Sequence, residues 1–232
     1  MFVANYPLKS FIQKAVMALH LPLDYGTFHP YRALQQRALS DTMDFIVKHM
    51  PSALAFDTPK DLMEYAVKRI MPAGVVAEFG VNEGGSINHL AKLLRGRTID
   101  GFDSFQGLPE NWSGNQMEAG YFNRGGKLPK VAANVQLHTG WFSDSLPKFV
   151  AANSAPIALL HIDCDIYSST ATIFEHLADR IVPGTVILFD EFFNYPAWEM
   201  HEFRAFSEFI ARTGKQFDYV GYSFKQVAVV MR

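Results

Sequence analysis

The spacing of hydrophobic positions along the chain changes near residue 73. Before that point, residues 30–50 and 59–71 carry apolar side chains at steps of three and four, and each stretch begins at a proline. This spacing is typical of amphipathic helices, whose first turn readily accepts proline. After that point, short apolar runs alternate with helical stretches. We therefore expect an N-terminal helical extension, residues 1–72, followed by one α/β domain, residues 73–232.

The second part has the pattern of alternating strands and helices. Runs typical of buried strands cover residues 75–79, 98–102, 135–139, 158–162, 185–189, 217–220 and 226–230. Helical spacing follows the first run and reaches Gly96, the expected C-cap, and two later helices end near Pro183 and Gly214. Such alternation predicts a mainly parallel sheet with helices on both faces, whose ligands bind beyond the carboxyl ends of the strands.

Residues 11–21 form a separate apolar stretch at helical spacing. They are too few to span a bilayer and include Gln13, Lys14 and His20, so we expect an amphipathic helix and not a membrane span or a signal peptide. If this helix packs on a second subunit, the protein forms a homodimer or a larger homo-oligomer. Packing on the body of the protein and docking on a membrane surface are the alternatives.

Composition excludes several classes of protein. The chain of 232 residues is 49% hydrophobic and 19% charged, with a net charge of −2. These values exclude a disordered or collagen-like chain and argue against nucleic acid as a partner. The single cysteine can form neither an intramolecular disulfide nor a multi-thiolate zinc site, and it favours a reducing, cytoplasmic location.

The first strand of the α/β domain runs into a glycine-rich turn, residues 78–86 (EFGVNEGGS). The turn lets a ligand approach a helix N-terminus, but it is neither the dinucleotide motif G-x-G-x-x-G nor a P-loop. About 20 residues later, Asp103 ends the second strand, where a carboxylate can hold a ribose diol. Together these features favour an adenosine-type ligand. The alternatives are a turn without a ligand, a loop role for Asp103, and Asp100 as the ribose-binding residue.

Four carboxylates follow the fourth and fifth strands: Asp163, Asp165, Asp190 and Glu191. If these strands are neighbours, their ends lie about 5 Å apart. Like charges at that distance repel and raise one another's pKa unless a cation lies among them. Because no lysine or arginine is close in the sequence, we predict a divalent ion such as Mg²⁺. Helix N-capping by Asp165 and a basic partner from a distant part of the chain are the alternatives.

The connection of residues 104–134 is long and rich in glycine and proline, which favours a lid or a substrate-binding loop. Its aromatic residues Trp112, Tyr121 and Phe122 are candidates to line a pocket. Trp141 and Phe142, directly after the third strand, are candidates to contact a flat ring such as adenine. Packing in the core is the alternative for each of them.

Five short segments stand out at these strand ends: residues 78–86, 103–109 (DSFQGLP), 140–142 (GWF), 161–170 (HIDCDIYSST) and 189–191 (FDE). Together they resemble the macrocin O-methyltransferase family. These are class I S-adenosylmethionine (SAM) methyltransferases, several of them magnesium-dependent and acting on sugar hydroxyls of natural products. The resemblance extends from Pro59 to the C-terminus. It implies a Rossmann-like sheet of seven strands whose last strand is antiparallel.

The same resemblance implies roles for individual residues. SAM would lie on the glycine-rich turn, with Asp103 at its ribose and Trp141 and Phe142 near its adenine. The implied cofactor-binding residues are Glu78, Gly80, Asn82, Glu83, Gly84, Ser86, Asp103, Ser104, Trp141, Phe142 and Asp163. The implied metal ligands are Asp163, Asp190 and Glu191.

These observations predict a magnesium-dependent O-methyltransferase that methylates a hydroxyl of a sugar or another small natural product. A bound cation lowers the pKa of a hydroxyl, which makes Asp163 a catalytic residue. More distant, catechol-type methyltransferases have a lysine where this chain has Ile166, so the candidate bases are His201, Asp165 and Tyr195. For His201 a packing role is the alternative. A non-catalytic SAM-binding or scaffolding protein and a nucleotide-sugar oxidoreductase are the alternative functions.

Overall fold

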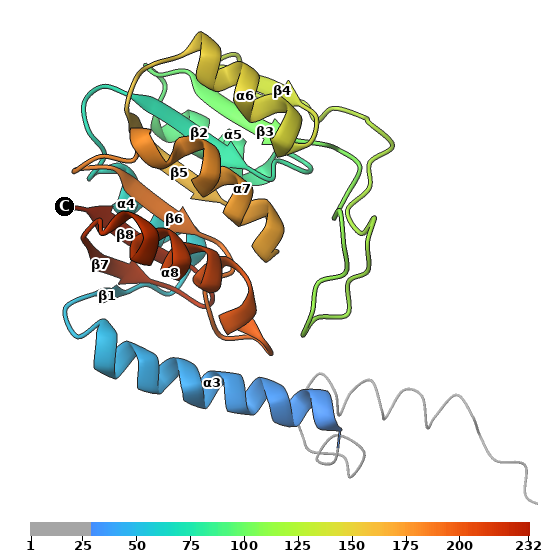
Figure 1. The fold of residues 1–232 in the computed structure, drawn as a ribbon, viewed down its shortest axis with the longest axis vertical. Coiled ribbons are helices and arrows are strands. Elements are labelled where there is room, and N and C mark those ends of the chain that lie inside the picture. The colour runs from blue at the N-terminus through green and yellow to red at the C-terminus, as the bar shows by residue number, and fades with distance from the viewer. Residues whose placement is uncertain (1–28) are drawn as a thin grey trace, which may run out of the picture.

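A computed structural model describes residues 29–232, so the helix predicted at residues 11–21 lies outside the described residues (Figure 1). In the described part, the strands are β1 (Leu54–Ala55), β2 (Val75–Phe79), β3 (Ile99–Asp103), β4 (Val135–Thr139), β5 (Ile157–Ile162), β6 (Val186–Phe189), β7 (Phe217–Tyr222) and β8 (Val227–Met231). The α-helices are α3 (Pro30–His49), α4 (Pro59–Val67), α5 (Gly85–Leu93), α6 (Phe142–Ala152), α7 (Tyr167–Leu177) and α8 (Glu202–Thr213). Two short 3₁₀ helices are η1 (Ala178–Arg180) and η2 (Trp198–Met200).

The strands form one sheet in the order β1-β7-β8-β6-β5-β2-β3-β4. Every neighbouring pair is parallel except those of β8, which is antiparallel to both β6 and β7. The predicted Rossmann-like sheet with an antiparallel last strand is therefore confirmed. The predicted number of seven strands is wrong, because β1 adds an eighth. Its two residues pair with Gly221 and Tyr222 at the edge of β7, and a run so short has no periodicity of its own.

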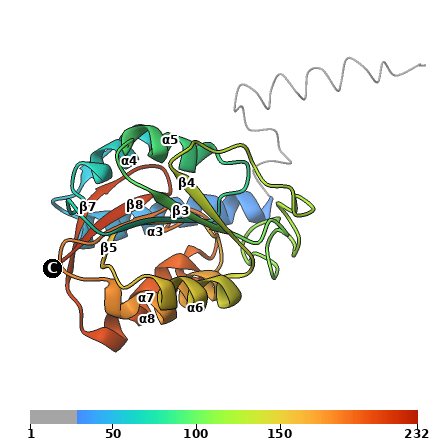
Figure 2. The ribbon, with the colours of Figure 1, turned by 90° about the horizontal axis from the view of Figure 1, so that it is seen from above.

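Helices cover both faces of the sheet and divide the hydrophobic core into two parts. Figure 2 shows α4 and α5 on one face and α6, α7 and α8 on the other. The larger part of the core joins α6–α8 and α3 to the sheet and holds most of the buried phenylalanines, such as Phe174, Phe189 and Phe206. The smaller part joins α4 and α5 to the sheet through residues such as Leu62, Ile87 and Leu90. Both faces of the central strands are thus shielded from water, as continuously apolar strands require.

Most of the predicted helix ends are confirmed. Pro30 and Pro59 lie in the first turns of α3 and α4, and Gly214 is the C-cap of α8 in the left-handed conformation, φ +66°. Gly96 is not the C-cap of α5, because that helix ends at Leu93 and is capped at Leu94. Long-range bonds explain the difference: Asn134 Nδ2 donates to the carbonyls of residues 91, 94 and 97, satisfying the helix end from another segment.

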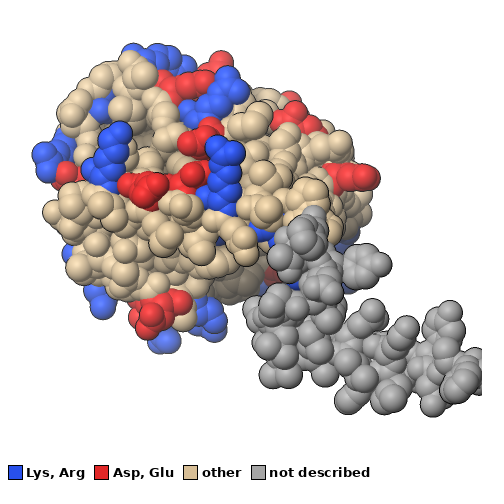
Figure 3. All heavy atoms as spheres, turned by 90° about the horizontal axis from the view of Figure 1, so that it is seen from below, with Lys and Arg blue, Asp and Glu red and all other residues tan. Residues whose placement is uncertain are grey.

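Charged side chains are mixed in sign on the surface. Figure 3 shows Lys and Arg interspersed with Asp and Glu on the face viewed there, consistent with the net charge of −2. Among residues 29–232, none of the helices combines the length and the hydropathy needed to cross a membrane.

Candidate functional site

The glycine-rich turn after β2 is held by Asp103, at the end of the neighbouring strand β3. The backbone N–H groups of Val81 and Asn82 each donate to Asp103 Oδ2 at 2.8 Å, and the N–H of Phe105 donates to Oδ1 at 2.6 Å. A carboxylate offers about four acceptor positions, so Asp103 can still accept from a ligand. Gly80, at φ +92°, allows this turn to touch β5, since a Cβ there would lie 1.7 Å from the Asp163 carbonyl oxygen.

Directly beneath the turn, Glu78 and His161 form a buried pair across β2 and β5. Their Cα positions are register partners, and Glu78 Oε2 lies 2.8 Å from His161 Nδ1. The side chain of Glu78 is fully buried and that of His161 nearly so. Ser86 Oγ donates to the other carboxylate oxygen at 2.8 Å. Burial alone would lower the pKa of His161, but the hydrogen bond to Glu78 and the charges of Glu78 and Asp190 raise it above its ordinary value.

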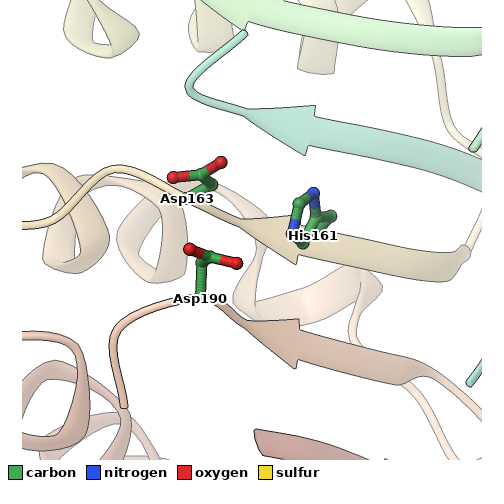
Figure 4. Close-up of side chains that lie close together, drawn as sticks. All are labelled: His161, Asp163 and Asp190. Atoms are coloured by element: carbon green, nitrogen blue, oxygen red, sulfur yellow. The ribbon is translucent and has the colours of Figure 1, made fainter. Parts of the chain in front are cut away.

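Asp163, at the end of β5, belongs to two overlapping groups of possible metal ligands. His161, Asp163 and Asp190 each offer a ligand atom within 4.8 Å of the others, and so do Asp163, Asp165 and Glu191. Figure 4 shows the side chains of Asp163 and Asp190 close together beyond the ends of β5 and β6. The three predicted ligands thus meet at Asp163 but do not form one such group. Besides Asp163, Asp190 is grouped with His161, whereas Glu191, the next residue, is grouped with Asp165.

Asp163 and Glu191 of this cluster have strongly perturbed acidity. Burial raises the pKa of Asp163 well above its ordinary value, and the charges of Asp190 and Asp165 add to the shift. Burial likewise raises the pKa of Glu191, with a further contribution from Asp190. Glu191 Oε2 is buried without a hydrogen-bond partner among the described residues. Buried like charges of this kind need either protons or a cation.

Two residues that the sequence did not single out also belong to this cluster. Lys225, between β7 and β8, places its Nζ 3.8 Å from Glu191 Oε1, so the predicted alternative of a distant basic partner applies to Glu191. Glu202, the first residue of α8, is fully buried, and its Oε2 accepts a hydrogen bond from the Glu191 backbone N–H at 3.0 Å. An acidic residue in a first helical turn and a lysine beside a strand are both common, so the sequence carries no signal that distinguishes them.

The three candidate bases lie in different surroundings. Asp165 is buried at the cavity wall, and burial together with the charge of Asp190 raises its pKa to about 7. The N-cap of α7 is Ile166 without a side-chain cap, so the predicted capping alternative for Asp165 does not occur. His201 lies 2.8 Å through Nε2 from the Ser113 carbonyl, and Tyr195 donates to the Glu191 carbonyl at 3.2 Å. Neither His201 nor Tyr195 lines the cavity described next.

A cavity of about 470 Å³ opens at the carboxyl edge of the sheet. Among the predicted cofactor-binding residues, its wall includes Gly80, Asn82, Asp103, Ser104, Trp141, Phe142 and Asp163. Glu78, Glu83, Gly84 and Ser86 do not line it: Glu78 lies in the core, and Glu83 pairs with Arg124 on the surface. Asp165 and Glu191 line the cavity too, whereas Asp190 does not.

The long connection of residues 104–134 forms another wall of this cavity. It extends beyond the sheet as the green segment in Figure 1. Its contribution to the wall includes Leu108, Trp112, Met117 and Phe122. Trp112 is almost completely buried and packs against Tyr195 with ring centroids 5.6 Å apart. One cavity therefore joins the glycine-rich turn, the acidic cluster and an apolar loop surface.

This fold and this site define an α/β protein of the Rossmann-like methyltransferase type, with a ligand cavity beyond the carboxyl ends of its parallel strands. A family model described as "Methyltransferase domain" matches residues 77–192, half of the chain. The chain belongs to this methyltransferase-domain family.

Two relatives that the chain resembles are named as O-methyltransferases of natural products. The chain is 29% identical over 157 residues to the 8-demethyl-8-(2,3-dimethoxy-alpha-L-rhamnosyl)-tetracenomycin-C 4'-O-methyltransferase of Streptomyces olivaceus, covering 57% of this chain and 59% of the relative. It is 29% identical over 167 residues to the mycinamicin III 3''-O-methyltransferase of Micromonospora griseorubida, covering 61% and 64%. The chain thus matches about three fifths of the length of these relatives. The predicted resemblance to macrocin-type sugar O-methyltransferases is confirmed at the level of the family.

A solved structure supports the fold over a longer part of the chain. The crystal structure of the calicheamicin methyltransferase CalS11 superposes with a TM-score of 0.62 and 20% sequence identity. It covers 87% of this chain and 93% of that chain. The similarity therefore extends beyond the segment matched by the family model.

Proposed function

We propose that the protein is a SAM-dependent O-methyltransferase that methylates a hydroxyl of a sugar or another small natural product. The observation that carries this proposal is the single cavity that joins the turn held by Asp103 to the acidic cluster around Asp163. A methyl donor and an acceptor hydroxyl must lie side by side for transfer, and one shared cavity meets that requirement. The relatives are named as O-methyltransferases of a rhamnosyl-tetracenomycin and of mycinamicin III, and these names support a glycosylated natural product as the acceptor.

Residues around the turn are suited to hold SAM. Asp103 keeps acceptor positions for ribose hydroxyls, while its bonds to Val81 and Asn82 fix its orientation. Trp141 and Phe142 line the same cavity as Asp103 and offer flat surfaces for adenine. The buried Glu78 and the half-buried Ser86, which donates to it, would then support the turn from below and not contact the ligand.

Residues around Asp163 are suited to hold a divalent cation. They offer carboxylate oxygens, the ligands that Mg²⁺ prefers. Glu191 Oε2 has no hydrogen-bond partner among the described residues and is therefore free to coordinate a cation. We propose Asp163 as the shared ligand, with Asp190 and Glu191 completing the protein's contribution. When bound, SAM supplies the methyl group and the cation lowers the pKa of the acceptor hydroxyl.

Asp165 is the residue that we propose to accept the acceptor's proton. It is a carboxylate that lines the cavity two residues after Asp163. His201 holds the Ser113 carbonyl of the long connection and Tyr195 holds the Glu191 carbonyl, so both act in support of the cavity wall.

Calorimetry with SAM and transfer of a radiolabelled methyl group to a panel of glycosylated natural products, with Mg²⁺ or with a chelator, tests the proposal. We expect Asp103→Ala to weaken SAM binding by roughly 1–3 kcal/mol, because ribose hydroxyls lose their acceptor. We expect Asp163→Ala to abolish Mg²⁺-stimulated transfer and to spare SAM affinity, while the exposed control Glu175→Ala changes neither. Absence of SAM binding would refute the proposal. SAM binding with no transfer by the unmutated protein would favour the non-catalytic alternative.

A further inference from the structure

The buried carboxyl of Glu202 has no role in the function proposed above. Glu202 begins α8, after Asp163 and Asp190 in the chain, and its side chain is fully buried. Its Oε2 accepts from the Glu191 backbone N–H at 3.0 Å, and the Cys164 backbone N–H also favours its ionised form. Its Oε1 has no hydrogen-bond partner among the described residues.

Burying an acidic side chain this deeply is costly unless hydrogen bonds compensate for the lost water. The hydrogen bond of Glu202 goes to the backbone amide of Glu191, the residue adjacent to Asp190 in the loop after β6. The Cys164 backbone N–H, in the loop after β5, adds to the stabilisation of its ionised form. Those two loops carry the proposed cation ligands.

We propose that Glu202 is a positioning residue for the cation site. It acts through the backbone, by holding the Asp190–Glu191 turn at the Glu191 N–H so that the ligand atoms of Asp163 and Asp190 stay close together. Its reach across to the Glu191 N–H matters for this role, and its negative charge does not. This inference rests on the cation binding proposed above.

Two conservative substitutions separate reach from charge. Glu202→Gln keeps a carbonyl oxygen at the position of Oε2 and removes the charge, while Glu202→Asp keeps the charge and withdraws it by one methylene. The matched control is Glu199→Asp, three residues earlier and exposed. Two readouts are measured: Mn²⁺ affinity of the whole protein, from electron paramagnetic resonance of free Mn²⁺, and hydrogen exchange of the backbone amide of Glu191.

We expect Glu202→Asp to weaken Mn²⁺ binding roughly 10–100-fold, the usual cost of losing a residue that orients metal ligands, with faster exchange at Glu191. Glu202→Gln and Glu199→Asp should stay within about threefold of the unmutated protein in affinity and keep the amide protected. SAM affinity should not change in any of them. The proposal is overturned if Glu202→Asp leaves the Glu191 amide protected, or if Glu202→Gln is the variant that fails.

Failure of the proposed function gives a different result. If the unmutated protein binds no Mn²⁺, the cation site itself is wrong, and the exchange of the Glu191 amide in the two variants still decides whether Glu202 holds this turn. If Glu202→Asp does not fold, Glu202→Gln alone decides. An intact exchange pattern in Glu202→Gln supports the proposal that the length of the side chain, and not its charge, holds the Glu191 N–H, and loss of protection at Glu191 refutes it.

Discussion

The buried pair of Glu78 and His161 is the point where the packing beneath the site can be tested most directly. Replacing His161 by leucine keeps most of the side-chain volume but leaves the Glu78 carboxylate fully buried with one remaining donor, the hydroxyl of Ser86. Breaking a buried pair by removing one partner costs roughly 3–5 kcal/mol, because an uncompensated charge stays buried. That is a large part of the ordinary stability of a protein, about 5–15 kcal/mol.

Urea denaturation followed by circular dichroism measures this loss. With a slope of roughly 2–3 kcal/mol per molar urea, we expect the midpoint of His161→Leu to fall by about 1–2.5 M. The double variant Glu78→Met with His161→Leu should recover part of the loss, since an apolar pair of similar volume carries no buried charge. A loss below about 1 kcal/mol in His161→Leu, or a double variant that loses the sum of both single variants, would refute the reasoning.

Three further predictions concern the turn, a helix end and the long connection. Gly80→Ala should lower the stability by at least roughly 1–2 kcal/mol from the left-handed backbone alone, and by more from the contact of the new Cβ with the Asp163 carbonyl. Gly85→Ala should be tolerated, because a Cβ there would have no atom of another described segment within 4 Å. Thermal melting of the two variants compares these effects. Asn134→Ala should destabilise by roughly 1–3 kcal/mol, since three carbonyls at 3.1–3.3 Å lose their donor, and equal melting temperatures would contradict this. Burial lowers the pKa of His201, although the hydrogen bond to Ser113 opposes the shift. His201 is therefore protonated at a higher pH in the unfolded chain than in the folded protein, so the unfolded chain binds more protons around the ordinary histidine pKa. Stability should therefore fall as pH drops from about 7.5 through that pKa of about 6.5, and His201→Gln should reduce the difference in urea midpoint between pH 7.5 and 5.5.

Local patterns predicted the elements of the fold because periodicity is a local property. Strands β2 to β8 lie within a few residues of the expected positions, and α3, α4 and α8 begin or end at the expected prolines and glycine. Strand β1 and the cap of α5 were missed because each depends on a partner elsewhere in the chain. Gly221 and Tyr222 of β7 pair with β1, and Asn134 satisfies the end of α5.

Some residues of the candidate site were likewise predictable from the local sequence, and others were not. Asp103 and Asp163 were predictable because both lie at the carboxyl ends of strands, and these ends must meet at one edge of a parallel sheet. The motifs of residues 103–109 and 161–170 also carry the family resemblance in the sequence itself. The separation of Asp190 from Glu191, the ion pair of Lys225 and the buried contact of Glu202 were not predictable, because they depend on side-chain directions and on segments distant in sequence.

The sequence by itself determined an α/β sheet of methyltransferase type, a glycine-rich turn with an acidic residue after the next strand, and a concentration of carboxylates after two later strands. Those features are read from order, spacing and residue type along the chain. Only the tertiary structure decided that Glu78 supports the turn from the core, that Asp163 belongs to both ligand groups, and that α8 reaches the acidic loop after β6 through Glu202. The physical reason is that burial and hydrogen bonding depend on which segments meet in space, and β2, β5, β6 and α8 meet only once the sheet has formed.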